Sequence, residues 1–165
     1  MYEVIDNFLS KDDFNILKKN MLGSHFPWYF SNEITEGTKD EKLSKDYYMI
    51  HSFYNKNDND KSKHFELLKP ILNKISFNAL LRIKGNLYNH SEKLIYHKKH
   101  IDYDYKHNGA IFFVNSNDGF TILDDDTKIE SIENRILFFD SSKLHNSTNC
   151  TNEKVRVNIN FNFLG

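Results

Sequence analysis

The chain ends in a strictly alternating stretch, Val155-Arg156-Val157-Asn158-Ile159-Asn160-Phe161-Asn162-Phe163. Successive side chains of a β-strand point to opposite faces, so this pattern predicts a strand with one apolar face and one polar face. If the apolar face packs beneath helices, the polar row lines a cavity. An edge strand with a solvated polar face is the alternative that the pattern leaves open.

Strand-like runs also fill most of the chain between residue 79 and this last strand. Turn sequences separate them, most clearly Asn117-Asp118-Gly119. The predicted strands cover residues 80–88, 93–97, 110–114, 120–123, 128–132 and 136–139. Many short strands at close spacing favour a sandwich or barrel over an alternating strand and helix fold. We therefore expect helices packed against a small antiparallel β-barrel.

The N-terminal segment carries the signals of a short strand followed by a helix. Residues 4–9 have strand-like composition. Ser10 is a favourable N-cap, with Asp13 at the third helical position, and Gly23 marks the expected end of the helix. One face of this helix is apolar and is expected to pack inward, through Phe14, Leu17 and Met21.

A second helix is predicted over residues 63–75, with a kink at Pro70 because proline removes one backbone donor and crowds the preceding turn. A strand is predicted over residues 47–54, between polar stretches at 32–46 and 55–62. The first stretch is long for a connection within a compact domain. It is either a lid over a substrate site or a solvated surface loop.

The length of the chain, 165 residues, suits one domain with a real core. We expect a single domain over residues 1–165, with helical support mainly in 1–78 and the β-barrel core in 79–165. The 22 basic side chains nearly balance the 23 acidic ones, so the charge favours neither a polynucleotide nor a membrane surface as partner.

The cysteine content and the absence of targeting signals predict a cytoplasmic protein. Cys150 is the single cysteine, which excludes an internal disulfide and fits a reducing compartment. No apolar run approaches the roughly 20 residues that a membrane span needs. The first residues lack the basic and apolar regions of a secretory signal peptide.

A candidate metal site is formed by His100-Ile101-Asp102 and, further along the chain, His145. Residues two apart in a strand point the same way, so His100 and Asp102 are able to bind one ion. His145 follows the predicted strand 136–139, in a loop that a β-barrel could place at the same open end as His100 and Asp102. Two imidazoles and one carboxylate are the ligand set of facial-triad Fe(II) sites. Other histidines nearby leave the choice of ligand open: His90, His97 and His107.

Arg156, on the polar face of the last strand, supplies the second clue. A guanidinium pairs with a carboxylate through two parallel hydrogen bonds, which an ammonium group does not match. The three metal positions that a facial triad leaves open accommodate a bidentate 2-oxo acid and O2. Arg156 would then hold the carboxylate of this acidic co-substrate.

These residues and their flanking motifs resemble the prolyl-4-hydroxylase-like 2-oxoglutarate/Fe(II) oxygenases, in particular the short forms encoded by phages. The resemblance covers residues 80–163, and residues 4–10 fit less specifically. It implies a double-stranded β-helix, which agrees with the strand pattern. The motifs that carry it are His100-Ile101-Asp102, Gly109-Ala110-Ile111-Phe112-Phe113-Val114-Asn115, Asn134-Arg135-Ile136-Leu137-Phe138-Phe139-Asp140, His145 and Arg156-Val157-Asn158-Ile159-Asn160-Phe161.

The resemblance also implies roles for single residues. His100, Asp102 and His145 would bind the iron, and Arg156 the distal carboxylate of 2-oxoglutarate, with Lys154 as the alternative. Contacts to the co-substrate or the substrate are expected from Asn86 and Tyr88. The chain departs from the family at Phe112 and Phe113, where relatives often carry tyrosines. Tyr88 or Tyr96 would then supply the missing hydroxyl.

The function implied is hydroxylation of a C–H bond, in first place of a prolyl residue in a peptide or protein, with Fe(II), 2-oxoglutarate and O2. The same chemistry on a free amino acid or a nucleobase is one alternative. A catalytically inert β-barrel binding module is the other, and it predicts that loss of His100 or His145 has no functional effect. Tyr103 and Tyr105 either line the substrate mouth or pack structurally.

Overall fold

The computed structural model describes residues 1–31, 47–58 and 61–165. The stretch 32–46, with its predicted lid or loop, lies outside the described residues. The elements are β1 (Glu3–Ile5), α1 (Lys11–Met21), β2 (Tyr29–Ser31), β3 (Tyr48–Asn55), a 3-10 turn (Phe65–Leu68), α2 (Lys69–Leu72), β4 (Ala79–Asn89), β5 (Asn108–Phe113), β6 (Phe120–Ile122), β7 (Lys128–Glu130), β8 (Arg135–Asp140), β9 (Asn146–Ser147) and β10 (Val155–Leu164).

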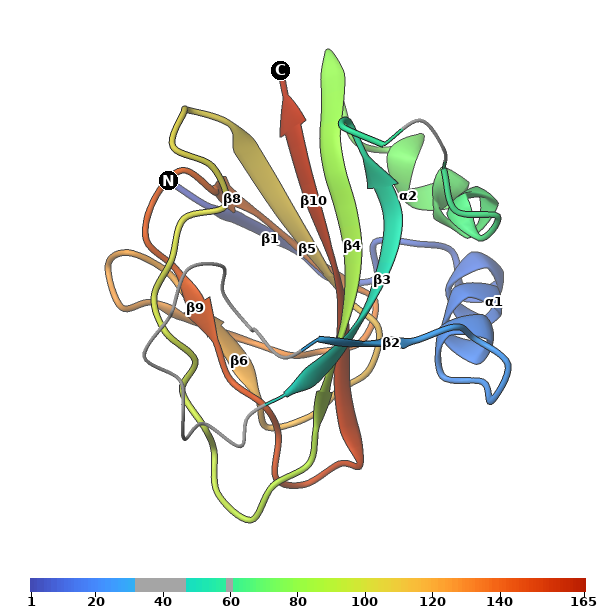
Figure 1. The fold of residues 1–165 in the computed structure, drawn as a ribbon, viewed down its shortest axis with the longest axis vertical. Coiled ribbons are helices and arrows are strands. Elements are labelled where there is room, and N and C mark those ends of the chain that lie inside the picture. Colours follow the sequence, from blue (N-terminus) through green and yellow to red (C-terminus); the bar gives the residue numbers. More distant parts are fainter. Residues whose placement is uncertain (32–46, 59–60) are drawn as a thin grey trace.

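Two antiparallel sheets face each other across the interior of the molecule (Figure 1). The larger sheet has the strand order β1-β8-β5-β10-β4-β3-β2, and the smaller has the order β7-β6-β9. Single bridges, Tyr96 to Thr148 and His100 to His145, continue the smaller sheet onto the segment before β5. The helices lie outside the larger sheet (Figure 1). The expected β-barrel with helical support is confirmed.

β10 lies in the middle of the larger sheet, between β5 and β4. Its apolar side chains, from Val157 to Phe163, are buried in one cluster with Phe14, Leu17 and Met21 of α1. Its polar side chains are buried on the other face: Arg156, Asn158, Asn160 and Asn162. The predicted two-faced strand is therefore confirmed, and the edge-strand alternative is excluded because β10 is paired on both sides.

The N-terminal helix begins as predicted, with the Ser10 side chain accepting a hydrogen bond from the backbone N–H of Asp13. The second predicted helix, over residues 63–75, is wrong in extent. A 3-10 turn and the single turn of α2 take its place, and Pro70 lies at the start of α2. Proline suits the first helical turn, whose backbone donors have no partner within the helix.

Two further differences concern strands. Residues 93–97 make only the bridge at Tyr96 and form no regular strand. β2 and β9, which are three and two residues long, were not predicted. Two residues are too few to show any alternation. They form because longer neighbours, β3 and β6, offer them a paired edge.

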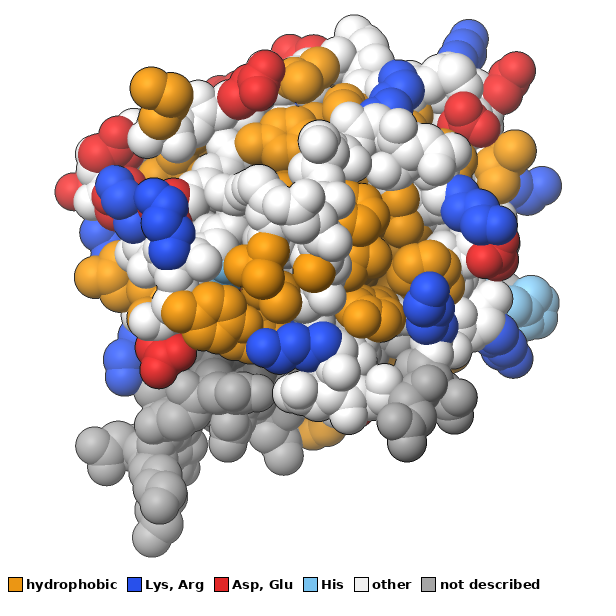
Figure 2. All heavy atoms as spheres, turned by 90° about the horizontal axis from the view of Figure 1, so that it is seen from above, with side chains coloured by type: hydrophobic (Ala, Val, Ile, Leu, Met, Phe, Trp, Pro, Cys, Tyr) orange, Lys and Arg blue, Asp and Glu red, His pale blue; other side chains and the backbone are white. Residues whose placement is uncertain are grey.

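The end of the molecule at which the C-terminus lies exposes several hydrophobic side chains in its centre, with Lys and Arg side chains around them (Figure 2). A groove of about 850 Å³ is lined in part by β1, β8 and the turn after α2, including Ile5, Ile75 and Phe138. Within the described part of the chain, no helix has the length and apolar character needed to cross a membrane.

Candidate active site

His100 and His145 are held opposite each other by the backbone. Each donates its N–H to the carbonyl of the other, at 2.9 Å in both directions. Their ring centroids are 4.6 Å apart. Asp102 follows two residues after His100, and one ligand atom from each of the three residues lies within 4.8 Å of the others. The structure thus brings together the three predicted metal ligands.

The carboxylate of Asp102 is held at both oxygens. Arg82 donates from Nη2 to Oδ1 at 2.6 Å, and Asn162 donates from Nδ2 to Oδ2 at 2.8 Å. The Ser141 hydroxyl also donates to Oδ2. Burial by itself would raise the pKa of Asp102, but Arg82, His145 and these hydrogen bonds hold the pKa well below its usual value. Asp102 is therefore ionised and oriented before any metal binds.

The position of Ser141 depends on a glycine in β5. A Cβ atom on Gly109 would lie 2.6 Å from the Cβ of Ser141, closer than side-chain carbons approach. Only glycine therefore lets the Ser141 hydroxyl reach Asp102 from the neighbouring strand.

The imidazole of His100 is kept neutral by its surroundings. Burial and the neighbouring His145 lower the pKa of His100 to about 4. A neutral imidazole carries the lone pair that a metal ion needs, so no proton must leave His100 at physiological pH.

Arg156 is completely buried, and its hydrogen-bond partners are uncharged. Its Nε donates to the Ser131 hydroxyl at 2.8 Å, its Nη1 to the Thr148 carbonyl at 3.1 Å, and its Nη2 to the Thr121 hydroxyl at 3.2 Å. Burial lowers the pKa of Arg156 to about 10, so the guanidinium stays charged. A buried cation with neutral partners is costly unless an anion joins it.

The absence of a side chain on Gly119 leaves room for the side chain of Arg156 at a tightly packed turn. A Cβ atom on Gly119 would lie 2.6 Å from the Cδ of Arg156 and 2.2 Å from the Asn149 carbonyl oxygen. The Asn117-Asp118-Gly119 turn therefore both reverses the chain and leaves space for the side chain of Arg156.

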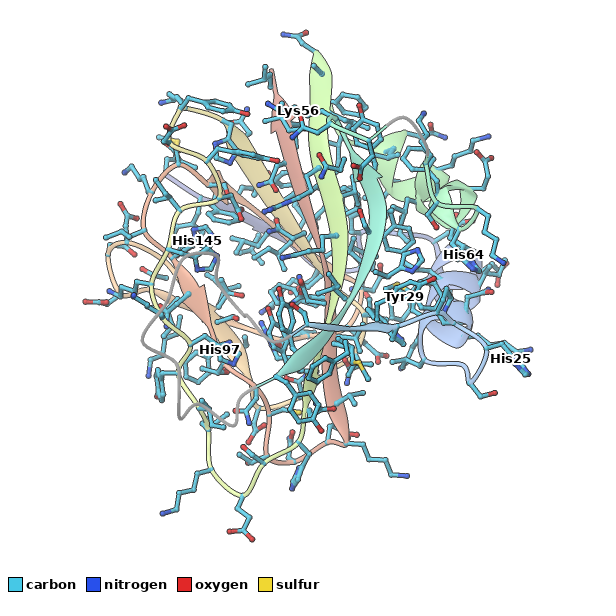
Figure 3. All side chains as sticks on the ribbon, viewed as in Figure 1. His25, Tyr29, Lys56, His64, His97 and His145 are labelled. Carbon is cyan, nitrogen blue, oxygen red and sulfur yellow. The ribbon has the colours of Figure 1, made fainter. Side chains whose placement is uncertain are left out.

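Tyr88 and His97 lie between Arg156 and the predicted metal ligand His100, whose charged form acts on the pKa of His97. The guanidinium carbon lies 5.4 Å from the centroid of the Tyr88 ring, and Tyr88 stacks on His97 at 4.9 Å. Burial lowers the pKa of His97 to about 3, helped by Arg156 and His100. Figure 3 shows His97 and His145 on the same side of the barrel, toward the smaller sheet. The three ligands and Arg156 therefore belong to one interior.

The other residues singled out in the sequence fall into two groups. Asn86 faces this interior, where it donates to the Asn158 side chain at 2.9 Å while its own Oδ1 has no partner. Lys154 is exposed in the turn before β10, and Tyr96 is 55% exposed beside Phe120. Of the two tyrosines expected to replace the missing hydroxyl, Tyr88 is the one beside Arg156.

The two phenylalanines that replace tyrosines of the family face opposite ways. Phe112 belongs to the core beneath α1, whereas Phe113 lies inside the barrel, 5.9 Å from the guanidinium carbon of Arg156. Only Phe113 therefore stands where a phenol would reach a ligand of Arg156.

Tyr103 and Tyr105 stack on each other at 5.3 Å near Asp102. The ammonium group of Lys56 lies over both rings and donates to the Tyr105 hydroxyl at 3.0 Å. Lys56 stands at the end of the barrel near the C-terminus (Figure 3). The tyrosine pair thus forms part of the rim beside the metal ligands.

Sequence analysis missed the residues that orient the site: Arg82, Thr121, Ser131, Ser141 and Asn162. Asn162 and Arg82 were both on predicted strands, and the alternation of the last strand placed Asn162 on its polar face. Nothing in the sequence indicated that they would meet Asp102, because the pairing of β4 with β10 brings them together.

No family model matches the sequence, and no curated protein resembles it closely enough to be matched. Solved structures do match. The viral collagen prolyl hydroxylase of Paramecium bursaria Chlorella virus-1, in complex with 2-oxoglutarate, has a TM-score of 0.61 at 15% identity, over 99% of this chain and 96% of that one.

Two other matches have different ligands. The prolyl hydroxylase of Trichoplax adhaerens, in complex with a peptide fragment of hypoxia-inducible factor, has a TM-score of 0.61 at 15% identity, over 98% of this chain and 83% of that one. HygX of Streptomyces hygroscopicus, with nickel and 2-oxoglutarate, has a TM-score of 0.63 at 11% identity, over 98% and 82%. These similarities establish the fold, a double-stranded β-helix, as the sequence predicts.

Proposed function

We propose that the protein is an Fe(II)- and 2-oxoglutarate-dependent oxygenase that hydroxylates a C–H bond, in first place of a prolyl residue in a peptide. The observation that carries the proposal is the pairing of two features in one barrel. One is a compact set of two imidazoles and one carboxylate. The other is the buried Arg156 guanidinium, whose hydrogen-bond partners are neutral.

The metal would be held by His100, Asp102 and His145. Nitrogen and oxygen donors of this kind suit Fe(II), and the triad leaves adjacent positions for other ligands. When bound, iron supplies the oxidising chemistry that no protein side chain provides. The protein's own contribution is to orient the three ligands, through Arg82, Ser141 and Asn162, and to exclude competing reactions.

Arg156 would bind the distal carboxylate of 2-oxoglutarate. The hydroxyls of Thr121 and Ser131 already accept hydrogen bonds from the guanidinium and hold it in place. Tyr88 and His97 would line the co-substrate between Arg156 and the metal ligands. Burial raises the pKa of Tyr88, so its phenol stays protonated and acts as a neutral hydrogen-bond partner.

The choice of a prolyl substrate rests on similarity to prolyl hydroxylases, one of them with a bound peptide. A small-molecule substrate is the second candidate. HygX, whose structure includes hygromycin B, matches this chain at a similar TM-score of 0.61. The fold is therefore compatible with both substrate classes.

The first test is the visible charge-transfer band that an Fe(II) site shows when 2-oxoglutarate chelates the metal. The band should appear when the purified protein is mixed anaerobically with both. It should be lost in His145→Ala and weakened in Arg156→Ala. Succinate production with proline-rich peptides, compared with free amino acids, then separates the two substrate classes.

Lys154→Ala is the matched control for Arg156→Ala, since it removes a neighbouring cation that is exposed. It should leave the band unchanged. Absence of the band from the folded intact protein would contradict the proposal and favour the inert binding module.

A further inference from the structure

Four side chains donate hydrogen bonds to the carboxylate of Asp102: Arg82, Ser141, Asn160 and Asn162. Arg82 donates from Nη2 to Oδ1 of Asp102 at 2.6 Å and from Nε to Oδ1 of Asn162 at 3.2 Å. Asn162 in turn donates to Oδ2 of Asp102 at 2.8 Å. Arg82 and Asn162 are direct partners in the pairing of β4 with β10. Side chains of these two strands therefore hold both oxygens of Asp102 through hydrogen bonds.

Little solvent reaches this arrangement. The side chain of Asp102 is 4% exposed and that of Arg82 is 19% exposed. The guanidinium also lies over the Tyr103 ring, 5.4 Å from its centroid. A charge-assisted hydrogen bond in such surroundings is strong and well oriented, so Asp102 has little freedom to rotate.

The two oxygens of Asp102 differ in what lies near them. Oδ2 is 3.8 Å from Nε2 of His145 and accepts hydrogen bonds only from neutral side chains, those of Ser141, Asn160 and Asn162. Oδ1 is taken by Arg82. A carboxylate that chelates a metal needs both oxygens turned to the same ion, and the guanidinium opposes this at Oδ1.

The number of oxygens that Asp102 offers decides how many metal positions remain. With one oxygen, the three residues leave three of the six positions of an octahedral ion open. With two oxygens, only two positions remain, and a bidentate 2-oxo acid fills both. No position would then be left for a diatomic gas.

We propose that Arg82 is a positioning residue that restricts Asp102 to a single coordinating oxygen and so keeps a third metal position open beside 2-oxoglutarate. This role rests on the proposed function, because it concerns the same metal site. Arg82 acts through Asp102 and needs no contact with the substrate.

Nitric oxide tests the proposal directly, because it binds Fe(II) only where a position is open and gives an S = 3/2 electron paramagnetic resonance signal. The probe is added anaerobically to protein loaded with Fe(II) and 2-oxoglutarate. The charge-transfer band first confirms that metal and co-substrate are bound. Arg82→Gln should keep the band but lose about tenfold in the nitrosyl signal, the size of effect typical for residues that orient metal ligands.

Two variants serve as controls. Arg82→Lys keeps a cation near Oδ1 and should retain most of the nitrosyl signal. Lys19→Gln removes one exposed positive charge from α1, outside the larger sheet, and leaves the contacts of Asp102 in place. It should give the wild-type signal.

Each contrary result has its own meaning. Equal nitrosyl signals in Arg82→Gln and the wild type would overturn the role of Arg82 alone. Equal losses in Arg82→Gln and Lys19→Gln would also overturn it, in favour of a general effect of charge. Loss of the band in Arg82→Gln would show that Arg82 is needed for metal binding itself, which contradicts the proposal. Absence of the band from the wild type would refute the proposed function.

Discussion

The two faces of β10 are both buried, yet they are built from opposite chemistry. One face places Val157, Ile159, Phe161 and Phe163 against α1. The other places Arg156, Asn158, Asn160 and Asn162 inside the barrel. Burial of the apolar face stabilises the fold, by roughly 25 cal/mol per Å² of apolar surface. Burial of the polar face costs free energy unless every group is paired.

In the protein alone, hydrogen bonds do not fully offset the free-energy cost of burying the polar face of β10. Arg156 has only neutral partners, and Oδ1 of both Asn86 and Asn160 is buried without a hydrogen bond. Unpaired buried polar groups are uncommon in folded proteins and each needs an explanation. A bound ligand supplies one. The comparison therefore separates a face that serves stability from a face whose incompletely paired polar groups fit the proposed binding function.

The largest effect is expected from the apolar face. Phe161→Ala removes a completely buried ring and should lower the free energy of unfolding by about 3–5 kcal/mol, from lost transfer energy and the cavity left behind. Urea denaturation measures this change. Asn160→Ala, on the opposite face of the same strand, removes one long hydrogen bond to Asp102 and should cost only about 1–2 kcal/mol. Equal losses of unfolding free energy in Phe161→Ala and Asn160→Ala would contradict the proposed difference between the two faces.

A smaller effect is expected from Arg156→Met, and on binding rather than on stability. Methionine fills similar volume without a buried charge, so the free energy of unfolding should change by less than about 1 kcal/mol. Affinity for 2-oxoglutarate should fall by about 2–4 kcal/mol, roughly 30-fold or more, because the carboxylate loses its buried partner. Titration of the charge-transfer band measures the affinity. A loss of stability without a loss of affinity for 2-oxoglutarate would show that Arg156 has a structural role only.

The third effect concerns pH and is the smallest when it is measured over a single pH unit. Burial lowers the pKa of His97 to about 3, below the unfolded value near 6.5, so the unfolded chain binds a proton that the folded protein excludes. The metal-free protein should therefore lose about 1.4 kcal/mol of stability per pH unit from this residue as the pH falls from about 6.5 toward 3. In His97→Phe the slope should be shallower by this amount. Phe163→Leu, on the apolar face, should keep the wild-type slope.

The predictable parts of the site are those that follow from the spacing of residues close together in the sequence. His100 and Asp102 are two residues apart in an extended segment, and the alternation of β10 placed Arg156 on the polar face. Arg82, Thr121 and Ser131 were not recognised. Arginine and small hydroxyl residues are common on polar faces, and only strand pairing shows which ones meet a ligand.

The helix predicted over residues 63–75 illustrates the opposite failure. Residues 63–75 were predicted to form a helix with a kink at Pro70, but the chain forms a 3-10 turn before this proline and a single helical turn at it. Tertiary packing of Leu68 and Ile71, both completely buried, is satisfied by this shorter arrangement. Packing outweighed the weak helical preference.

By itself, the sequence determined that β10 has two unlike faces, that His100 and Asp102 point the same way, and that Ser10 starts a helix. Side-chain direction and capping depend on the nearest few residues, so they can be read from order alone. The tertiary structure alone decided that both faces of β10 are buried, that His145 lies opposite His100, and that Arg82 and Asn162 hold Asp102. Such contacts join residues far apart in the chain, and only the pairing of strands brings them within hydrogen-bonding distance.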